Sequence, residues 1–319
     1  MSLSRRRFIA ISACAAATGL PVAPAHAMPA ARWKGVALGA KADIRLVGLP
    51  ERRANNLLQK VRAEISRLEK EFSLYQADST LSRLNRDGQL LQPGADMLGL
   101  LGLVSAVHAA SGERFDPTVQ PVWDAYARAA GKPDIKALRA AETQLGWQRV
   151  AFDTSAVSLP EGGALTLNGI AQGYVTDRVV ALLRQAGLEN ALVEVGEISA
   201  MGRPREGGLW QIHLGENDGS AISIRDKAVA TSAAEGTMIG GAASHLIDPL
   251  TARSCRSKWL RTSVVHKSAA IADAVSTAAS LMDLDEIKAM MAQFEGASFV
   301  GLHSELGHVS HAHYGRMRS

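Results

Sequence analysis

Cysteine is scarce in this sequence, with two residues in 319, Cys14 and Cys255. Cys14 falls in an N-terminal segment that has the features of a cleaved leader, which leaves Cys255 alone in the mature chain. A single cysteine cannot form an intrachain disulfide, so packing must stabilise the core. Long apolar runs are also missing after the N-terminus, where none reaches the roughly 18 residues that a membrane-spanning helix needs. We therefore expect a globular protein without a spanning helix.

A concentrated patch of positive charge is missing as well. The net charge is +4, but three of the positive charges lie in the first 27 residues, so the rest of the chain carries +1. The other basic residues form only short clusters, at 52–53 and within 253–261. A nucleic-acid-binding protein presents a basic face or stripe, so we expect no nucleic-acid partner. The length of 319 residues suits one large domain or two intimately joined lobes.

The first 27 residues have the order of a signal peptide. Arginines at 5–7 precede an apolar run that extends from Ile11 to Val22, and an Ala-His-Ala site ends at Ala27. The arginines resemble those of a twin-arginine export signal, which predicts the export machinery as a partner and the periplasm as the location. The segment 11–14 also resembles a lipobox that would leave Cys14 lipidated. The apolar run before it is short, so cleavage after Ala27 is favoured.

The mature chain mixes helix and strand patterns without regular alternation, which predicts an α+β fold. Apolar spacing predicts helices at 51–72, 96–110, 134–145, 175–186, 268–281 and 284–294. Strands are predicted as a pair within 36–47 and at 191–195, 210–214, 221–224, 228–231 and 299–302. Alternation around Gly162 and Gly163 predicts a hairpin over 157–167. We divide the chain into the leader 1–27, a domain at 28–303, and a polar tail at 304–319.

Five segments combine polar and small residues as binding sites do: 72–85, 112–119, 168–177, 244–249 and 271–278. Each also has an ordinary explanation, such as helix capping, a turn, a satisfied histidine or a solvated helix face. Glycines before a helix let the backbone approach a phosphate, and the helix N-terminus favours anions. Asp273 and Thr277 share one face of a predicted helix, and their hard oxygen atoms suit Mg²⁺.

Six blocks, taken in their order along the chain, resemble the FAD:protein FMN transferase family (the ApbE family). The first three are the aromatic and serine block at 72–85, a block at 115–121 and the glycine block at 169–177. The others are the Thr-Ser pair at 231–232, Ser-His-Leu-Ile-Asp-Pro at 244–249 and Ala-Asp-Ala-Val-Ser-Thr-Ala at 272–278. The resemblance extends from Gly39 to Val300.

This resemblance implies two closely joined α/β lobes, related to the T-fold, with a flavin site between them. It implies Mg²⁺-dependent transfer of the FMN half of FAD to a Thr or Ser hydroxyl of an extracytoplasmic acceptor protein, with release of AMP. His245 is the implied general base, with Asp248 near it in sequence. The implied metal ligands are the Asp273 and Thr277 side chains and the Gly169 carbonyl, and Asp273 is thereby also catalytic. The implied FAD contacts are Leu38, Tyr75, Arg114, Phe115, Asp116, Thr166, Gln172 and Ile247.

The chain departs from the family pattern at five loop positions. These are Gln172 for lysine or glutamate, Thr166 for aspartate, and Glu197, Ala233 and Arg253 for glycine. The departures keep a second hypothesis open, a periplasmic flavin-scavenging protein that binds or hydrolyses FAD with little transferase activity. A third hypothesis is an exported metal-binding or interaction protein that uses the tail histidines His308, His311 and His313.

Overall fold

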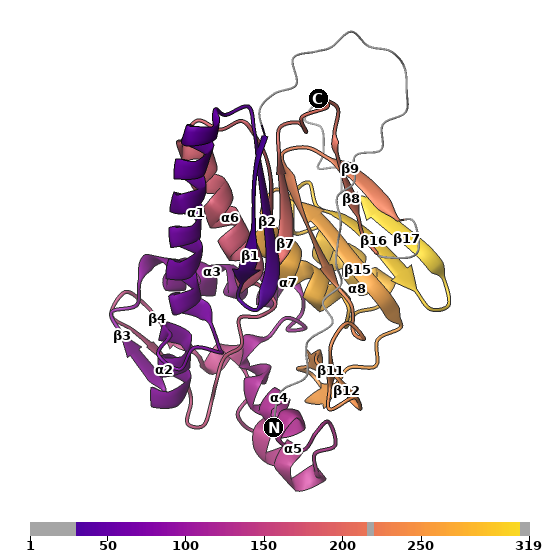
Figure 1. Ribbon diagram of the computed structural model, residues 1–319. Coiled ribbons are helices and arrows are strands. Elements are labelled where there is room, and N and C mark those ends of the chain that lie inside the picture. The colour runs from indigo at the N-terminus through magenta and orange to yellow at the C-terminus, as the bar shows by residue number, and fades with distance from the viewer. Residues whose placement is uncertain (1–29, 216–219, 313–319) are drawn as a thin grey trace, which may run out of the picture.

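The computed structural model describes residues 30–215 and 220–312 (Figure 1). The predicted leader with Cys14, and the last tail histidine, His313, lie outside these ranges. Helices and strands follow one another without regular alternation, and one large sheet carries a layer of helices. The predicted α+β class is therefore confirmed.

An eight-stranded sheet forms the centre of the molecule, and each neighbouring pair of its strands is antiparallel. Its order is β1 (Ala30–Ala37), β2 (Ala40–Val47), β6 (Asn190–Val195), β7 (Glu197–Met201), β10 (Lys227–Ser232), β15 (Trp259–His266), β16 (Ser298–His303) and β17 (Gly307–Ala312). Gly196 alone joins β6 to β7, with a φ of 85° that favours glycine. The first residue of β7 is therefore fixed directly after a tight turn.

Helices cover one face of this sheet, as Figure 1 shows for α1, α6 and α7. They are α1 (Glu51–Phe72), α3 (Ala95–Ala110), α6 (Ala171–Gln185), α7 (Ala269–Ala279) and α8 (Leu284–Met291). α1 buries the apolar side chains that recur on one side of it, from Leu57 to Phe72. Alternate strand residues complete this core, for example Val193 and Val195 of β6. The main hydrophobic core therefore lies between the helices and the sheet.

The opposite face of the sheet is covered by a hairpin of β8 (Trp210–His213) and β9 (Ala221–Ile224). Trp210 and Ile212 of β8 are buried there against residues such as Leu192 of β6. Because Leu192 points away from Val193 along the strand, β6 has a buried residue on each face. β6 is thus an interior strand of the sheet.

A smaller part lies below the sheet in Figure 1. It holds α4 (Gln120–Arg128), α5 (Ile135–Glu142) and the hairpins of β11 (Met238–Ile239) with β12 (Ala243–Ser244) and β13 (Ile247–Asp248) with β14 (Arg253–Ser254). Val122, Leu138 and Ile247 belong to its own buried cluster. The remaining elements are α2 (Thr80–Asp87), β3 (Gln89–Leu91), β4 (Ala151–Phe152), β5 (Ala156–Ser158) and 3₁₀ turns at Pro117–Val119 and Trp147–Arg149.

The predicted helices and sheet strands are confirmed, with shifted ends, but the predicted hairpin over 157–167 is wrong. Only its first residues form a strand, β5, which pairs with β3 and β4. Leu165 instead pairs with a side chain: its N–H donates to Asn85 Oδ1 and its carbonyl accepts from Asn85 Nδ2, both at 2.8 Å. The alternation in the sequence reflects a loop buried against the core, where Leu165 and Leu167 pack.

Part of the segment predicted to be a polar tail continues the sheet as β17, antiparallel to β16. His308 and His311 lie three residues apart on this strand, so their side chains point to opposite faces. Within residues 30–215 and 220–312, no group of three or more His, Cys, Asp or Glu side chains is arranged to hold a metal ion. In the same ranges no helix is long and apolar enough to cross a membrane.

Candidate active site

A cavity of about 290 Å³ lies between the helix-covered sheet and the smaller part. Its wall combines the turn between β1 and β2, the segment before α4, the turn before α6, the facing ends of β7 and β10, the β11 to β13 region, and α7. Eleven of the twelve predicted site residues line it: Leu38, Arg114, Phe115, Asp116, Thr166, Gly169, Gln172, His245, Ile247, Asp273 and Thr277. Segments that are far apart in sequence therefore meet at one site.

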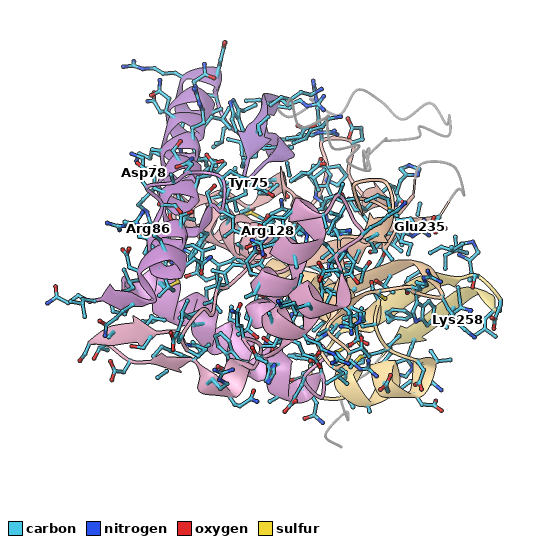
Figure 2. All side chains as sticks on the ribbon, turned by 90° about the horizontal axis from the view of Figure 1, so that it is seen from below. Tyr75, Asp78, Arg86, Arg128, Glu235 and Lys258 are labelled. Carbon is cyan, nitrogen blue, oxygen red and sulfur yellow. The ribbon has the colours of Figure 1, made fainter. Side chains whose placement is uncertain are left out.

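Tyr75 is the predicted site residue that does not line the cavity. It lies in the loop after α1, with 54% of its surface exposed (Figure 2). Its neighbours in the same block have structural contacts. Ser73 accepts a hydrogen bond from the Tyr75 N–H at 3.0 Å, and Ser79 caps α2 by accepting from the Ser82 N–H at 3.0 Å. These contacts give the block a structural role in the loop between α1 and α2.

The start of α7 is fixed by a half-buried carboxylate from α6. Asp177 accepts hydrogen bonds from Ser268 Oγ at 2.6 Å and from the N–H groups of Ala269 and Ala270 at 2.7 and 3.1 Å. These are N–H groups that a helix leaves without partners inside itself. One turn further on, α7 presents Asp273 and Thr277 to the cavity. The position of both side chains thus depends on the contact between α6 and α7.

Asp273 is only 5% exposed, and its Oδ2 accepts a hydrogen bond from the Gly173 N–H at 3.2 Å. Burial raises the pKa of Asp273 to about 7. Desolvation disfavours an ionised carboxylate unless positive charge or hydrogen-bond donors offset it. A cation in the cavity would provide that offset.

Gly169 and Thr277 bring two further oxygen atoms to Asp273's side of the cavity. A Cβ atom at Gly169 would lie 3.1 Å from Thr277 Oγ1 and 3.3 Å from the Phe115 ring, so only glycine lets the backbone pass this close without displacing a neighbour. Carboxylate, hydroxyl and carbonyl oxygens are ligands that Mg²⁺ accepts, and it takes the remainder from water and phosphate. These residues therefore fit the implied ion, with substrate oxygens completing its shell.

Gln172 has a structural contact at the cavity wall. Its Nε2 donates to the carbonyl of Leu38 at 3.4 Å, and the N–H of Leu38 donates to Glu69 Oε1 at 2.7 Å. Leu38 has a φ of 46°, a region that side chains disfavour, so these two contacts hold a strained turn against the cavity. A neutral amide therefore positions the β1–β2 turn where the family pattern has a charged residue.

Each residue of the segment 114–116 is fixed by hydrogen bonds or ion pairs to neighbouring elements. The Phe115 carbonyl lies 2.9 Å from His108 Nδ1, and its N–H donates to Ser111 Oγ at 3.0 Å. Asp116 accepts from the Thr118 N–H at 2.7 Å and from the Trp147 N–H at 3.2 Å. The Phe115 ring and the Asp116 carboxylate are thereby fixed on the cavity wall.

Arg114 makes ion pairs with residues of two separate elements. It contacts Asp248 of β13 at 3.3 Å and Glu286 of α8 at 3.2 Å. Asp248, which is close to His245 in sequence, therefore has Arg114 as a partner in space. This ion pair connects the smaller part of the molecule to the helix layer.

His245 lies with its Nδ1 atom 2.9 Å from the carbonyl oxygen of Thr237. A carbonyl only accepts, so Nδ1 carries the proton of the neutral ring and Nε2 is the basic nitrogen. The side chain lines the cavity that Asp273 and Thr277 also line. It is thus the residue on this wall best suited to accept a proton from a bound hydroxyl group.

Glu197 is a cavity residue that the sequence prediction recognised only as a departure from the family pattern. It is 8% exposed, and its Oε2 accepts a hydrogen bond from the Thr231 N–H at 3.3 Å. Burial and the nearby charge of Asp273 raise its pKa well above the usual range. The sequence does place Glu197 directly after Gly196. Only the pairing of β7 with β10, which the sequence does not show, indicates that its side chain faces the cavity.

The fold and cavity define an α+β protein with a site lined by carboxylate, hydroxyl, imidazole and guanidinium groups. A family model described as the ApbE family matches residues 38–300, so the chain belongs to the ApbE family. The FAD:protein FMN transferase of Klebsiella pneumoniae (strain 342) is 25% identical over 303 residues, which cover 87% of this chain and 86% of that protein. The one from Vibrio cholerae (strain O395) is 29% identical over 272 residues, with 78% and 80% covered.

Solved structures share the same fold. The flavin transferase ApbE from Vibrio cholerae has a TM-score of 0.78 at 23% identity, covering 89% of this chain and 97% of that chain. The apo form of the flavinyl transferase ApbE from Pseudomonas stutzeri has a TM-score of 0.76 at 24% identity, covering 91% and 97%. The predicted family and fold are therefore confirmed.

Proposed function

We propose that this ApbE-family protein is an FAD:protein FMN transferase that moves the FMN half of FAD onto a Thr or Ser hydroxyl of an acceptor protein and releases AMP. The observation that carries the proposal is the cavity that Asp273, Thr277 and Gly169 line together with His245. Oxygen ligands for a cation and a base for a hydroxyl group are the two requirements of this reaction. The curated relatives named for this activity support it.

The residues have separate roles in the reaction. A Mg²⁺ ion held by Asp273, Thr277 and the Gly169 carbonyl would neutralise charge on the pyrophosphate. His245 takes the proton of the acceptor hydroxyl at Nε2, while its Nδ1–H donates to Thr237. The hydroxyl oxygen forms a bond to the phosphorus of FMN, and the bond from that phosphorus to the AMP oxygen breaks. If water attacks instead, the products are FMN and AMP.

An in-gel assay tests this proposal. The mature protein is mixed with FAD, Mg²⁺ and a flavin-acceptor domain, and flavin fluorescence is read after denaturation. We expect a fluorescent acceptor band that disappears with EDTA. A band that persists in EDTA would contradict the metal requirement, and free FMN without a band would favour hydrolysis.

One observation favours the alternative of a flavin-scavenging protein that binds or hydrolyses FAD. Gln172 supplies no charge, and its amide donates to the Leu38 carbonyl. The cavity wall therefore lacks the charge that the family pattern has at this position. Tight FAD binding without a fluorescent acceptor, in the same gel assay, would support this alternative.

We also propose that the protein acts in the periplasm after twin-arginine export, as the leader at 1–27 predicts. The double variant Arg5→Lys with Arg6→Lys keeps the charge of the leader and replaces the first two of its three arginines. We expect the full chain in the periplasmic fraction and the double variant in the cytoplasm. A membrane-bound wild type that Cys14→Ala releases would instead support the lipid-anchored form.

A further inference from the structure

Glu197 is held rigidly at the wall of the cavity. Its Oε2 accepts from the Thr231 N–H at 3.3 Å, and its backbone carbonyl accepts from Thr176 Oγ1 at 3.2 Å. The preceding Gly196 has a positive φ, and a Cβ atom there would lie 2.5 Å from Gln172 Oε1. The backbone at Glu197 is therefore fixed, and the hydrogen bond from Thr231 places its carboxylate at the cavity wall.

In the described part of the chain, no basic side chain compensates the charges of Glu197 and Asp273. Among the described residues, neither carboxylate forms an ion pair with a lysine or arginine. Arg114, the arginine that lines the cavity, is paired with Asp248 and Glu286 instead. Two buried carboxylates without a basic partner are costly, because each has lost its hydration and they repel each other.

Glu197 is also connected to the side of the cavity where Thr277 lies. Thr231, whose N–H donates to Glu197, is followed directly by Ser232 on β10. Ser232 Oγ lies 3.3 Å from Thr277 Oγ1. The Glu197 carboxylate and the Thr277 hydroxyl are thus tied to adjacent residues of one strand.

From this arrangement we propose that Glu197 is a second carboxylate ligand, beside Asp273, of the divalent cation in the cavity. This inference rests on the proposed function, which supplies the cation. Two carboxylates match the charge of one divalent cation, and hard oxygen ligands of this kind suit Mg²⁺ and Mn²⁺. The ligand set implied by the family resemblance contains one carboxylate, whereas this chain would supply two. With the second carboxylate, the cation here binds before the FAD pyrophosphate contributes its charge.

Direct cation binding tests the role of Glu197 without measuring activity. Free Mn²⁺ is followed by electron paramagnetic resonance during titration of the mature protein in the absence of FAD, and Mg²⁺ is added as a competitor. Glu197→Gln keeps an oxygen that accepts from the Thr231 N–H but removes the charge. We expect its dissociation constant for Mn²⁺ to rise by about tenfold or more.

Glu194→Gln is the matched control, because Glu194 is a partly buried glutamate on the adjacent strand β6 that does not line the cavity. Its cation affinity is expected to change much less than that of Glu197→Gln, because Glu194 acts on Glu197 only through its charge on the adjacent strand. Glu197→Asp keeps the charge on a shorter side chain and should fall between the wild type and Glu197→Gln. A cooperative thermal unfolding transition without Mn²⁺ checks that Glu197→Gln is folded, and the rise in its unfolding temperature on adding Mn²⁺ should be smaller than in the wild type.

Asp273→Ala separates failure of this inference from failure of the proposed function. If Asp273→Ala loses cation binding and Glu197→Gln binds as tightly as the wild type, Glu197 is not a ligand and the proposed metal site stands. If both variants keep the wild-type affinity, the metal site itself is wrong. Equal weakening by Glu194→Gln and Glu197→Gln would show a general charge effect and overturn the assignment of Glu197.

Discussion

The contact between His245 Nδ1 and the Thr237 carbonyl decides which nitrogen of the imidazole ring can act as a base. Because Nδ1 donates to Thr237, Nε2 is the nitrogen with the lone pair that can take a proton. We expect His245→Ala to slow FMN transfer by about 100-fold or more. FAD binding should stay within about twofold, since the flavin contacts proposed for the cavity remain. Single-turnover rates and FAD titrations measure the two effects separately.

His245→Asn distinguishes a base from a positioning residue. Its side-chain amide can still donate to Thr237, but it cannot accept a proton at neutral pH. We expect the same loss of rate as in His245→Ala. Recovery of the rate in His245→Asn, or equal losses of rate and FAD binding, would show that His245 orients the loop or the flavin instead.

The helix α7 depends on its neighbour α6 for its first turn, through the three hydrogen bonds to Asp177. Asp177→Ala leaves the Ala269 and Ala270 N–H groups without their acceptor, and we expect the unfolding free energy to fall by about 1–2 kcal/mol. The shift of α7 should also weaken Mn²⁺ binding, because Asp273 lies on the next turn. Urea unfolding and cation titration check the two expectations.

Asp153→Ala is the control for this experiment. Asp153 also caps backbone N–H groups, those of Ser155 and Ala156, but in the exposed turn between β4 and β5. Its loss should leave Mn²⁺ binding unchanged. If Asp177→Ala lowers stability and leaves cation affinity at the wild-type value, α7 keeps its position without the cap.

The elements that the sequence predicts well are those whose burial follows a regular period. The spacing of Leu57, Val61, Ile65 and Leu68 marks the buried side of α1. The alternation at 157–167 is also regular, but it does not mark a hairpin. The backbone N–H and carbonyl of Leu165 form their hydrogen bonds with the Asn85 side chain rather than with a neighbouring strand. A pattern of burial therefore shows that a segment packs on the core, and it cannot show which group completes its hydrogen bonds.

The sequence predicts those site residues that lie close together in a short motif. It does not predict those that reach the cavity only through the pairing of distant strands. Asp273 and Thr277 are one helical turn apart, so the sequence alone places them together. Tyr75 belongs to a motif of the same kind, yet its side chain is exposed and does not line the cavity. Glu197 faces the cavity only because β7 pairs with β10 beside Thr231.

The cavity belongs to the whole molecule rather than to one of its parts. Its walls come from the sheet, the helices and the smaller part with α4 and β13. Arg114 joins these parts by its ion pairs to Asp248 and Glu286. The cavity is therefore complete only when segments from Leu38 to Leu281 have come together.

The same sheet that forms the cavity also buries an acid whose titration affects global stability. Glu194 of β6 lies opposite Asp43 of β2, and burial followed by the Asp43 charge raises its pKa from 4.5 to about 7. The folded protein then binds more protons than the unfolded chain, so this group lowers the unfolding free energy as the pH rises from 4.5 to 7. Above that range its effect is constant. Glu194→Gln removes the effect.

The difference in unfolding free energy between Glu194→Gln and the wild type isolates this group from the other titrating residues. We expect the difference, measured by urea unfolding with EDTA, to grow in favour of the variant from pH 5 to pH 7 and to level off above. Glu64→Gln is the control, since Arg67 lowers the pKa of Glu64 below its usual value, and its difference should not vary above pH 5. A constant difference for Glu194→Gln would mean that Glu194 ionises at its ordinary pKa, because Arg32 and Arg45 around Asp43 then offset its burial.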